Sequence, residues 1–365
     1  MKAFELSALL APFSTIVNRH AMSDTYRTLE IGKDYIYACA PWGTLEVDAE
    51  LGNTKPFWVD GERFIGVIKG MPNEEVVLKL GNNLIITAGD DADRVVLPIF
   101  GKLDLPKRLD WNPFLKEPSD LPKGWEGKAV EGLQLGSLAC GPQSMMSAGV
   151  YGTAFDFDDG GLMLSSSDSI TMATAYVAGF THPDWPDKLA LVPEAMVALA
   201  AVLKQKGAHN KIEFKSDLVQ VNAGPFYLAL KPAPLLKTDI LQICARFPSR
   251  EASTKIPTKE VESFITRIGI LSEAKQHAYV VLRISPTKLT LEFEEGAASS
   301  ERRIDVEAQN VTEDLPPIKL DAFRMARALA HAGQIGFEYI EQGTLIFWSN
   351  DFSYFVCGIR DGKEE

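Results

Sequence analysis

One pattern occurs three times in this sequence: a stretch with helical spacing of apolar residues, followed by three short stretches in which apolar and polar residues alternate. In the copy from Ile318 to Arg360, the residues Leu320, Phe323 and Leu329 recur at helical spacing until Gly333. The alternation after this glycine is typical of half-buried strands separated by tight turns. Similar patterns occupy residues 59–100 and 191–230.

The distance between the copies indicates a repeat of whole domains. Their first expected strands begin near Val76, Ile212 and Ile335, on the order of 130 residues apart, whereas a solenoid repeat spans roughly 20–50 residues. Each copy follows another helix and another set of strands, so each domain is predicted to contain two helices on an antiparallel sheet. We therefore expect an α+β fold with three similar domains, at residues 1–122, 123–250 and 251–365.

The apolar spacing also predicts where the main helices and the linkers lie. The stretch 101–127 is rich in Pro and Lys, and we expect it and residues 245–255 to be linkers between domains. The expected helices are residues 2–20, 59–71, 129–146, 192–207, 258–275 and 318–333.

The composition is that of a soluble globular protein, with 46% hydrophobic and 24% charged residues. No apolar run approaches the roughly 18 residues of a membrane helix, so no membrane partner is expected. Glu5 interrupts the apolar start of the chain, and no cleavage site for a signal peptide follows it. The four cysteines lack metal-ligand spacing, which favours reduced thiols and a cytoplasmic location.

The net charge of −12 bears on nucleic-acid binding, because affinity for DNA depends largely on neutralising phosphates. The six expected helices together carry slightly more Lys and Arg than Asp and Glu, so the acidic excess lies in the rest of the chain. This distribution fits a helix-lined surface that faces a polyanion while the outside stays acidic. It fits equally well the simpler interpretation that these helix surfaces are merely solvated.

No recognisable catalytic constellation appears in the sequence. The five histidines are isolated, and there is neither a phosphate-binding loop nor a dinucleotide-binding glycine pattern. Asp156, Asp158, Asp159 and Gly160 lack the ligand spacing of a calcium loop and are interpreted as a solvated turn. Cys140 has no histidine in a recognisable partner motif. We therefore predict a protein that is not an enzyme and that needs no cofactor or metal.

Three segments, in order along the chain, resemble the bacterial DNA polymerase III beta subunit, the replicative sliding clamp. They are FWVDGERFIGVIKGMPNEEVVLKLGNNLIITAG (57–89), LMLSSSDSITMATAYV (162–177) and FITRIGILSEAKQHAYVVLRISPTKLTLEFEEG (264–296). The resemblance covers nearly all 365 residues and marks a divergent member. It implies a head-to-tail homodimeric ring whose helices line a hole around duplex DNA, with DNA polymerase and a clamp loader as partners.

The resemblance and the cations of the expected helices together suggest which residues contact DNA. Arg324 and Arg327 are three residues apart on one helical face, and Lys204 and Lys206 end another helix, where cations also complement the helix dipole. A solvated surface is the alternative for each of them. The predicted DNA-binding residues are Arg19, His20, Arg27, Lys204, Lys206, Arg267, Lys275, Lys319, Arg324 and Arg327.

The resemblance also implies a cleft between the second and third domains that receives short hydrophobic peptides. Where relatives carry Gly-His-Arg after the aspartate, this chain has Ser169-Ile170-Thr171, and its last strand ends differently, so the partners of the cleft stay open. The predicted cleft residues are Val150, Ser167, Ser169, Ile170, Thr171, Met172, Pro234, Ile240, Val356, Cys357, Gly358 and Ile359.

The sequence therefore predicts a processivity factor that encircles DNA and tethers DNA polymerase and other replication and repair proteins. Two alternatives remain. One is a clamp-fold decoy or regulator that binds partner peptides without closing on DNA, and the other is an unrelated α+β enzyme with an unrecognised site.

Overall fold

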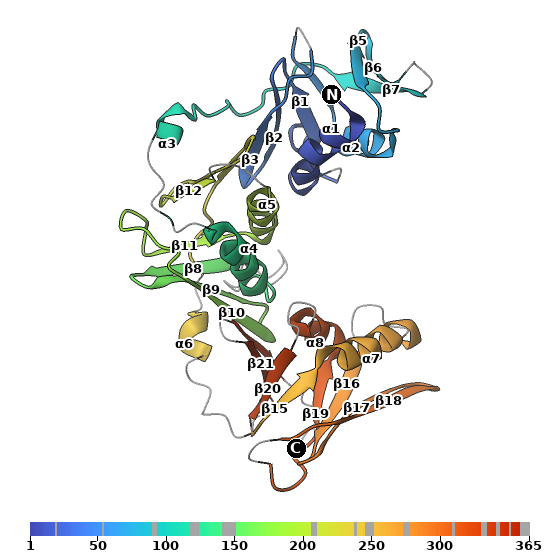
Figure 1. Ribbon diagram of the computed structural model, residues 1–365, viewed down its shortest axis with the longest axis vertical. Coiled ribbons are helices and arrows are strands. Elements are labelled where there is room, and N and C mark those ends of the chain that lie inside the picture. The colour runs from blue at the N-terminus through green and yellow to red at the C-terminus, as the bar shows by residue number, and fades with distance from the viewer. Residues whose placement is uncertain are drawn as a thin grey trace. The chain divides into compact units, whose positions relative to one another are not determined.

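A computed structural model of the chain shows helices combined with antiparallel sheets, which confirms the predicted α+β class (Figure 1). Among the described helices, none combines the length and the apolar character needed to span a bilayer. The structure describes residues 1–18, 20–52, 55–89, 93–116, 121, 124–140, 151–205, 210–236, 239–244, 252–272, 278–308, 311–329, 334–340, 344–349 and 352–357.

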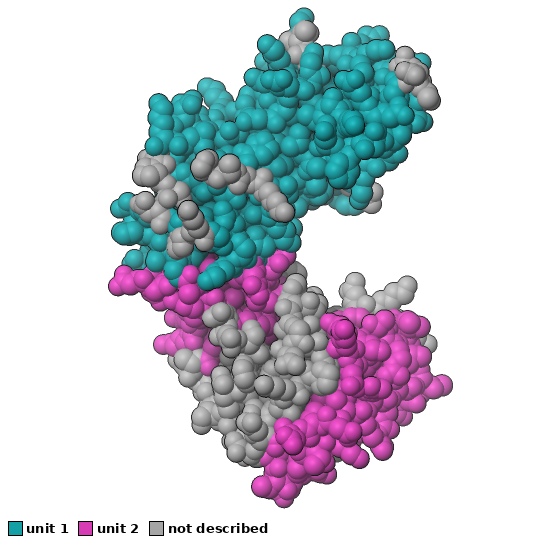
Figure 2. All heavy atoms as spheres, in the orientation of Figure 1, with its two compact units in different colours: residues 1–130, 179–234 teal, residues 131–178, 235–365 magenta. Residues whose placement is uncertain are grey.

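The chain forms two compact units, each built from two separate segments (Figure 2). Unit 1 contains residues 1–130 and 179–234, and unit 2 contains residues 131–178 and 235–365. Both units therefore take part of the second expected domain, and the division into three domains stays a prediction.

Unit 1 holds most of the first half of the chain, and α4 (Trp125–Gly136) runs from it into unit 2. Its other elements are α1 (Ala3–Leu10), the 3-10 helices η1 (Ala11–Thr15) and η2 (Asp24–Arg27), β1 (Thr28–Ile31), β2 (Tyr35–Ala40), β3 (Gly43–Asp48), β4 (Phe57–Asp60), α2 (Gly61–Gly70), β5 (Val76–Leu80), β6 (Asn83–Ala88), β7 (Asp93–Phe100), α3 (Asn112–Lys116), β11 (Lys188–Leu191), α5 (Pro193–Leu203), β12 (Lys211–Phe214), β13 (Val219–Ala223) and β14 (Phe226–Leu230).

Unit 2 contains the remaining elements. They are β8 (Thr153–Asp158), β9 (Gly161–Ser167), β10 (Thr171–Ala178), α6 (Ile240–Cys244), β15 (Ala252–Pro257), α7 (Thr258–Leu271), β16 (Tyr279–Ile284), β17 (Lys288–Glu295), β18 (Ala298–Asp305), β19 (Ile318–Asp321), α8 (Ala322–Leu329), β20 (Gln334–Ile340), β21 (Thr344–Ser349) and β22 (Phe352–Cys357).

The threefold pattern of the sequence is confirmed as structure. A helix precedes three antiparallel strands in α2 with β5–β7, in α5 with β12–β14 and in α8 with β20–β22. The same arrangement occurs in α1 with β1–β3 and in α7 with β16–β18. The two helices of such a pair lie side by side, as α1 with α2 and α7 with α8 (Figure 1).

The sheets run across the expected domain boundaries. In unit 1 the strand order is β12-β13-β14-β3-β2-β1-β4-β7-β6-β5, and β14 pairs with β3 through Tyr227 and Glu46. In unit 2, β10 pairs with β22, which joins β8, β9 and β10 to the strands β22, β21, β20 and β15. A second sheet of unit 2 has the order β18-β17-β16-β19. Because strand edges pair in this way, neighbouring repeats share continuous sheets.

Two expected helices begin later than predicted, because short strands occupy their first residues. β4 and β19 run to Asp60 and Asp321, and each aspartate then caps the following helix. The Asp60 Oδ1 accepts a hydrogen bond from the backbone N–H of Arg63 at 2.9 Å, and Asp321 does the same for Arg324 at 3.1 Å. The helices predicted to start at residues 59 and 318 therefore start at Gly61 and Ala322.

The expected first helix is also interrupted. α1 ends at Leu10 and a 3-10 helix follows, with Pro12 inside it. Proline has no backbone N–H to continue the α-helical hydrogen bonds, which explains the tighter turn. The predicted apolar face is buried at Leu6, Leu10 and Phe13, whereas Phe4 is exposed.

The part of the expected linker 101–127 that runs from Pro106 to Trp111 is anchored along the sheet of unit 1. Tyr37 Oη donates a hydrogen bond to the carbonyl of Pro106 at 3.0 Å, and Arg108 binds the buried carboxylate of Glu46. Trp111 packs against Tyr227. The second expected linker, residues 245–255, ends in a strand, since β15 begins at residue 252 and pairs with β20.

Candidate binding site

The turn between β9 and β10 holds most of the predicted cleft residues that the structure describes. Ser167 and Met172 face each other as the last paired residues of the hairpin. Ser169, in the turn, has a φ of 74°, a left-handed conformation that side chains disfavour. The exposed Ile170 follows it. The turn therefore presents an apolar side chain to solvent on a tightly constrained backbone.

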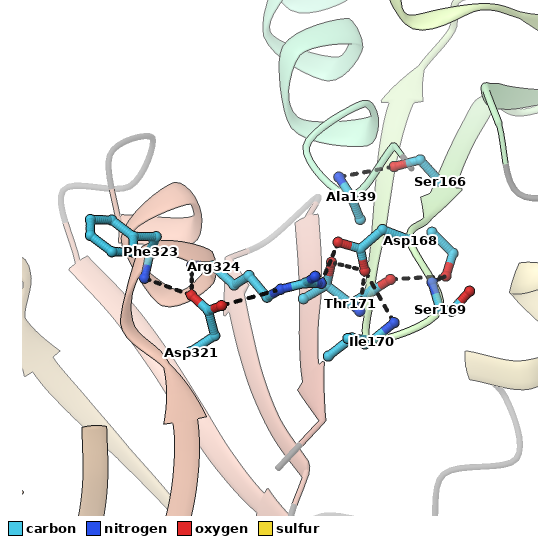
Figure 3. Close-up of polar contacts among 10 residues, drawn as sticks. Ala139, Ser166, Asp168, Ser169, Ile170, Thr171, Asp321, Phe323 and Arg324 are labelled. Atoms are coloured by element: carbon cyan, nitrogen blue, oxygen red, sulfur yellow. Dashed lines mark hydrogen bonds and ion pairs between the residues drawn. The ribbon is translucent and has the colours of Figure 1, made fainter. Parts of the chain in front are cut away.

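Asp168 shapes this turn with one oxygen of its carboxylate (Figure 3). Its Oδ1 accepts hydrogen bonds from the backbone N–H of Ile170 at 3.1 Å, from that of Thr171 at 2.7 Å and from the Thr171 hydroxyl at 2.8 Å. Ser167 Oγ donates to the Thr171 carbonyl at 2.9 Å and accepts from the Ser169 N–H at 3.1 Å. The Asp-Ser-Ile-Thr sequence thus satisfies its own backbone groups without regular secondary structure.

The other oxygen of Asp168 binds Arg324 of α8, so that one carboxylate serves both the turn and a distant helix (Figure 3). The Arg324 guanidinium also lies 3.6 Å from Asp321 Oδ2, measured at its Nε. The side chains of Arg324, Asp168 and Asp321 are 17%, 6% and 6% exposed. The guanidinium is therefore largely removed from water and lies between two carboxylates.

The last described strand, β22, also belongs to this part of unit 2. β10 and β22 are antiparallel, with Thr171 opposite Val356 and Met172 opposite Phe355. Val356 is fully buried. The structure therefore brings Thr171 and Val356, two predicted cleft residues far apart in sequence, into adjacent strands.

A small apolar cluster lies beside the turn. Met172 and Ile240 are buried against each other, and Leu236, Ile243 and Cys244 pack around them. α6, which carries most of these residues, packs on β9 and β10. Ile240 is one of the predicted cleft residues, but α6 was not predicted, although the apolar residues 236, 240 and 243 have helical spacing.

The remaining predicted cleft residues are not brought together by the described structure. Pro234 is exposed and belongs to unit 1. Cys357 ends β22, but its side chain lies outside the described part of the chain. Val150, Gly358 and Ile359 lie outside the described residues altogether.

The predicted DNA-binding cations fall into two groups in the structure. Lys204, at the end of α5, and Arg267, on α7, are exposed, and so is His20. Arg27, in contrast, lies 3.5 Å from both Asp24 and Asp60, and Arg324 is paired as described above.

The position of Lys319 also differs from the expectation. It lies in β19 rather than in a helix, and its Nζ is 5.5 Å from the centre of the Tyr279 ring. Arg327 lies in α8, but its side chain is outside the described part. Arg19, Lys206 and Lys275 lie outside the described residues.

The acidic turn between β8 and β9 is closed by the side chain of Asp158. Asp158 Oδ1 accepts hydrogen bonds from the N–H groups of Gly160 and Gly161, both at 2.8 Å. Within the described residues, no group of three or more His, Cys, Asp or Glu side chains is arranged to hold a metal ion.

Helix pairs on antiparallel sheets that continue from one repeat to the next define the DNA-clamp fold, and this chain matches that fold over 99% of its length. Among solved structures, the DNA polymerase III beta subunit of Thermotoga maritima matches it with a TM-score of 0.78 and 15% identity, over 99% of this chain and 98% of that chain. The beta subunit of Pseudomonas aeruginosa matches with a TM-score of 0.73 and 16% identity, over 99% of both chains.

A beta sliding clamp of Caulobacter crescentus matches with a TM-score of 0.74 and 15% identity, over 99% of this chain and 98% of that chain. No family model and no curated protein sequence matches the chain. The sequence identity to these beta clamps is low, so the similarity establishes a shared fold and no more.

Proposed function

We propose that this protein is a DNA sliding clamp: a homodimeric ring that encircles duplex DNA in the cytoplasm and tethers a DNA polymerase through a hydrophobic peptide site. The observation that carries the proposal is the match to beta-subunit structures over 99% of the chain. A match of this extent includes every repeat that a clamp needs. The protein acts through binding and topology, not through catalysis.

Two exposed features support assembly into a ring. β5 and β18 lie at the ends of their sheets, and beyond the hydrogen bond of Val76 to Met1 their outer edges can pair with another chain. Ile270 and Leu271, at the end of α7, are 79% and 39% exposed. Adjacent large apolar side chains that are exposed in this way suit a surface that another chain covers. Both features suit a head-to-tail contact that closes on itself.

The exposed cations Lys204 and Arg267 support DNA binding. Lys204 follows the last residue of α5, Arg267 lies on α7, and both are exposed and can neutralise a phosphate, whereas the carboxylates beside Arg27 already use its charge. A ring held by topology does not need tight phosphate contacts, so a few such cations are sufficient.

The apolar cluster at Met172 and the exposed Ile170 support peptide binding. The occupant that suits this surface is a short apolar segment, because apolar burial is the dominant interaction available there, and a peptide with Leu and Phe side chains serves as its probe. On this proposal, the clamp loader and the DNA polymerase that bind this protein each carry such a segment.

The test of this proposal is retention on circular DNA. We expect the loaded protein to stay on a nicked circular plasmid during gel filtration and to leave once the plasmid is linearised. The charge reversals Lys204→Glu and Arg267→Glu should lower loading or retention severalfold. Lys288→Glu, an exposed cation on β17, is the matched control and should have no effect.

The alternative, a decoy or regulator that binds clamp partners without closing on DNA, is favoured by one observation. Arg27 and Arg324, two of the predicted DNA contacts, have carboxylate partners. A protein that binds the apolar peptide, stays monomeric in light scattering and leaves circular and linear DNA equally fast would be this decoy.

A further inference from the structure

The ion pair between α8 and the β9–β10 turn suggests a role for Arg324 that differs from the predicted DNA contact. Asp168 and Asp321 use their carboxylates in the same way: one oxygen accepts backbone N–H groups locally, and the other faces the guanidinium. The turn and the start of α8 are thus shaped by the same two side chains that hold Arg324 (Figure 3).

Because the three side chains are largely buried, the loss of any one of them is costly. At 17% exposure or less, the charges are poorly screened, and removal of one partner leaves another charge without its counterion. An exposed pair such as Arg283 with Glu292, at 2.9 Å on β16 and β17, has no such consequence.

The β9–β10 turn also sets the positions of two predicted cleft residues, Ile170 and Met172. Ile170 lies between two residues whose backbone or hydroxyl groups bind Asp168 or Ser167, and Met172 begins the paired part of β10. A shift of Asp168 would therefore move the exposed Ile170 and change how Met172 packs against Ile240.

We propose that Arg324 is a positioning residue for the peptide site: by holding Asp168 against α8, it fixes the turn that presents the exposed Ile170, close to the buried Met172, to an apolar peptide. This inference rests on the proposed function, because it assigns a role within the same site. It also removes Arg324 from the DNA-contacting residues. Its partner is a peptide whose apolar residues bind beside the turn.

The test compares Arg324→Gln with Arg283→Gln, which removes an exposed ion pair of the same unit. The probe is a short fluorescent peptide with Leu and Phe at one end, with affinity measured by anisotropy. We expect the Kd of Arg324→Gln to rise at least tenfold and that of Arg283→Gln to stay within about twofold of the unaltered protein. Arg324→Lys, which keeps a charge, should recover part of the affinity.

Retention on circular DNA separates positioning from direct DNA contact. Arg324→Gln should be retained as well as the unaltered protein once loaded, because its guanidinium serves the turn. Loss of retention with unchanged peptide affinity would overturn the inference and restore Arg324 to the DNA surface.

Amide hydrogen exchange keeps the inference testable apart from the proposed function. Arg324→Gln should accelerate exchange in the peptide fragment that contains Ile170 and Thr171, and Arg283→Gln should not. If Arg324→Gln does not fold, Asp168→Asn is the replacement, since its Oδ1 still accepts the turn hydrogen bonds. Unchanged exchange in a folded variant overturns the positioning role, whereas failure of the unaltered protein to bind the peptide overturns only the proposed peptide function.

Discussion

Arg324 of α8 and Asp168 of the β9–β10 turn lie 156 residues apart in the sequence and form a buried ion pair. The contact joins a hairpin of the second expected domain to a helix of the third, both within unit 2. Close to it, β10 pairs with β22 along five residue pairs from Thr171 to Ala175. An ion pair and the pairing of two strands therefore connect the same two parts of the chain.

Replacement of Asp168 by Asn should lower the free energy of unfolding of unit 2 by about 2–3 kcal/mol. The variant loses the charge that pairs with Arg324 but keeps an acceptor for the turn, so the cost is below that of breaking a fully buried pair. Urea unfolding followed by circular dichroism measures it. Glu292→Gln, in an exposed pair, should cost at most about 0.5 kcal/mol, and an equal loss in both variants would contradict the prediction.

Ser169 should tolerate glycine but not a β-branched residue. Its φ of 74° is strained for any side chain and is most costly for valine, so Ser169→Val should destabilise the protein by about 1–2 kcal/mol. Ser169→Gly relieves the strain but increases the freedom of the unfolded chain, and the two effects should nearly cancel. Thermal unfolding of both variants tests this. A stable valine variant would show that the turn adopts another conformation in solution.

Met172 should contribute to peptide affinity through its apolar volume. Met172→Ala removes three methylene-sized groups that pack with Ile240, worth roughly 0.8 kcal/mol each, and should weaken binding of the Leu- and Phe-containing peptide by on the order of 50-fold. Met172→Leu conserves volume and should bind within about threefold of the unaltered protein. Equal affinities for the alanine and leucine variants would place the peptide elsewhere.

Dimer formation should depend on the exposed end of α7. The proposed dimer has a mass near twice 40.1 kDa in light scattering. We expect Ile270→Asp combined with Leu271→Asp to shift it toward monomer, because two charges would replace apolar contact area. Val197→Asp in α5 is the matched control, since Val197 is 58% exposed. A dimer unaffected by the double substitution would exclude this end of α7 from the interface.

Unit 1 should lose stability as the pH rises above about 9. Burial raises the pKa of the Cys39 thiol from 9.0 to about 11, so the folded state holds a proton that the unfolded chain releases in this range. The contribution of this group is fully present below pH 9 and declines as the pH approaches 11. Burial also raises the pKa of Tyr35 to about 12, which extends the decline.

Urea unfolding at pH 8, 9, 10 and 11 measures this effect. Cys39→Ala should flatten the decline between pH 9 and 11, whatever its effect on stability at pH 8. A parallel decline in both proteins would show that Cys39 does not contribute to the alkaline loss.

The sequence alone determined the repeat and the main elements. The apolar spacing after Ile318 and its two earlier copies predicted helix-plus-three-strand units, and all three exist, because local periodicity decides which face of an element becomes buried. Elements of weak local pattern escaped prediction. The polar edge strand β18 has almost no apolar alternation, and β4 and β19 were interpreted as the first turns of helices.

The candidate site depended on contacts that no local pattern contains. The predicted residues Ser167, Ser169, Ile170, Thr171 and Met172 lie together because they are neighbours in one hairpin. Val356 joins them only through the pairing of β10 with β22. Arg324 was predicted to face DNA because of its helical spacing, and the structure pairs its charge with a carboxylate 156 residues away. Periodicity shows which side of a helix is polar, but only the tertiary structure decides which of its charges meet a partner and which face solvent.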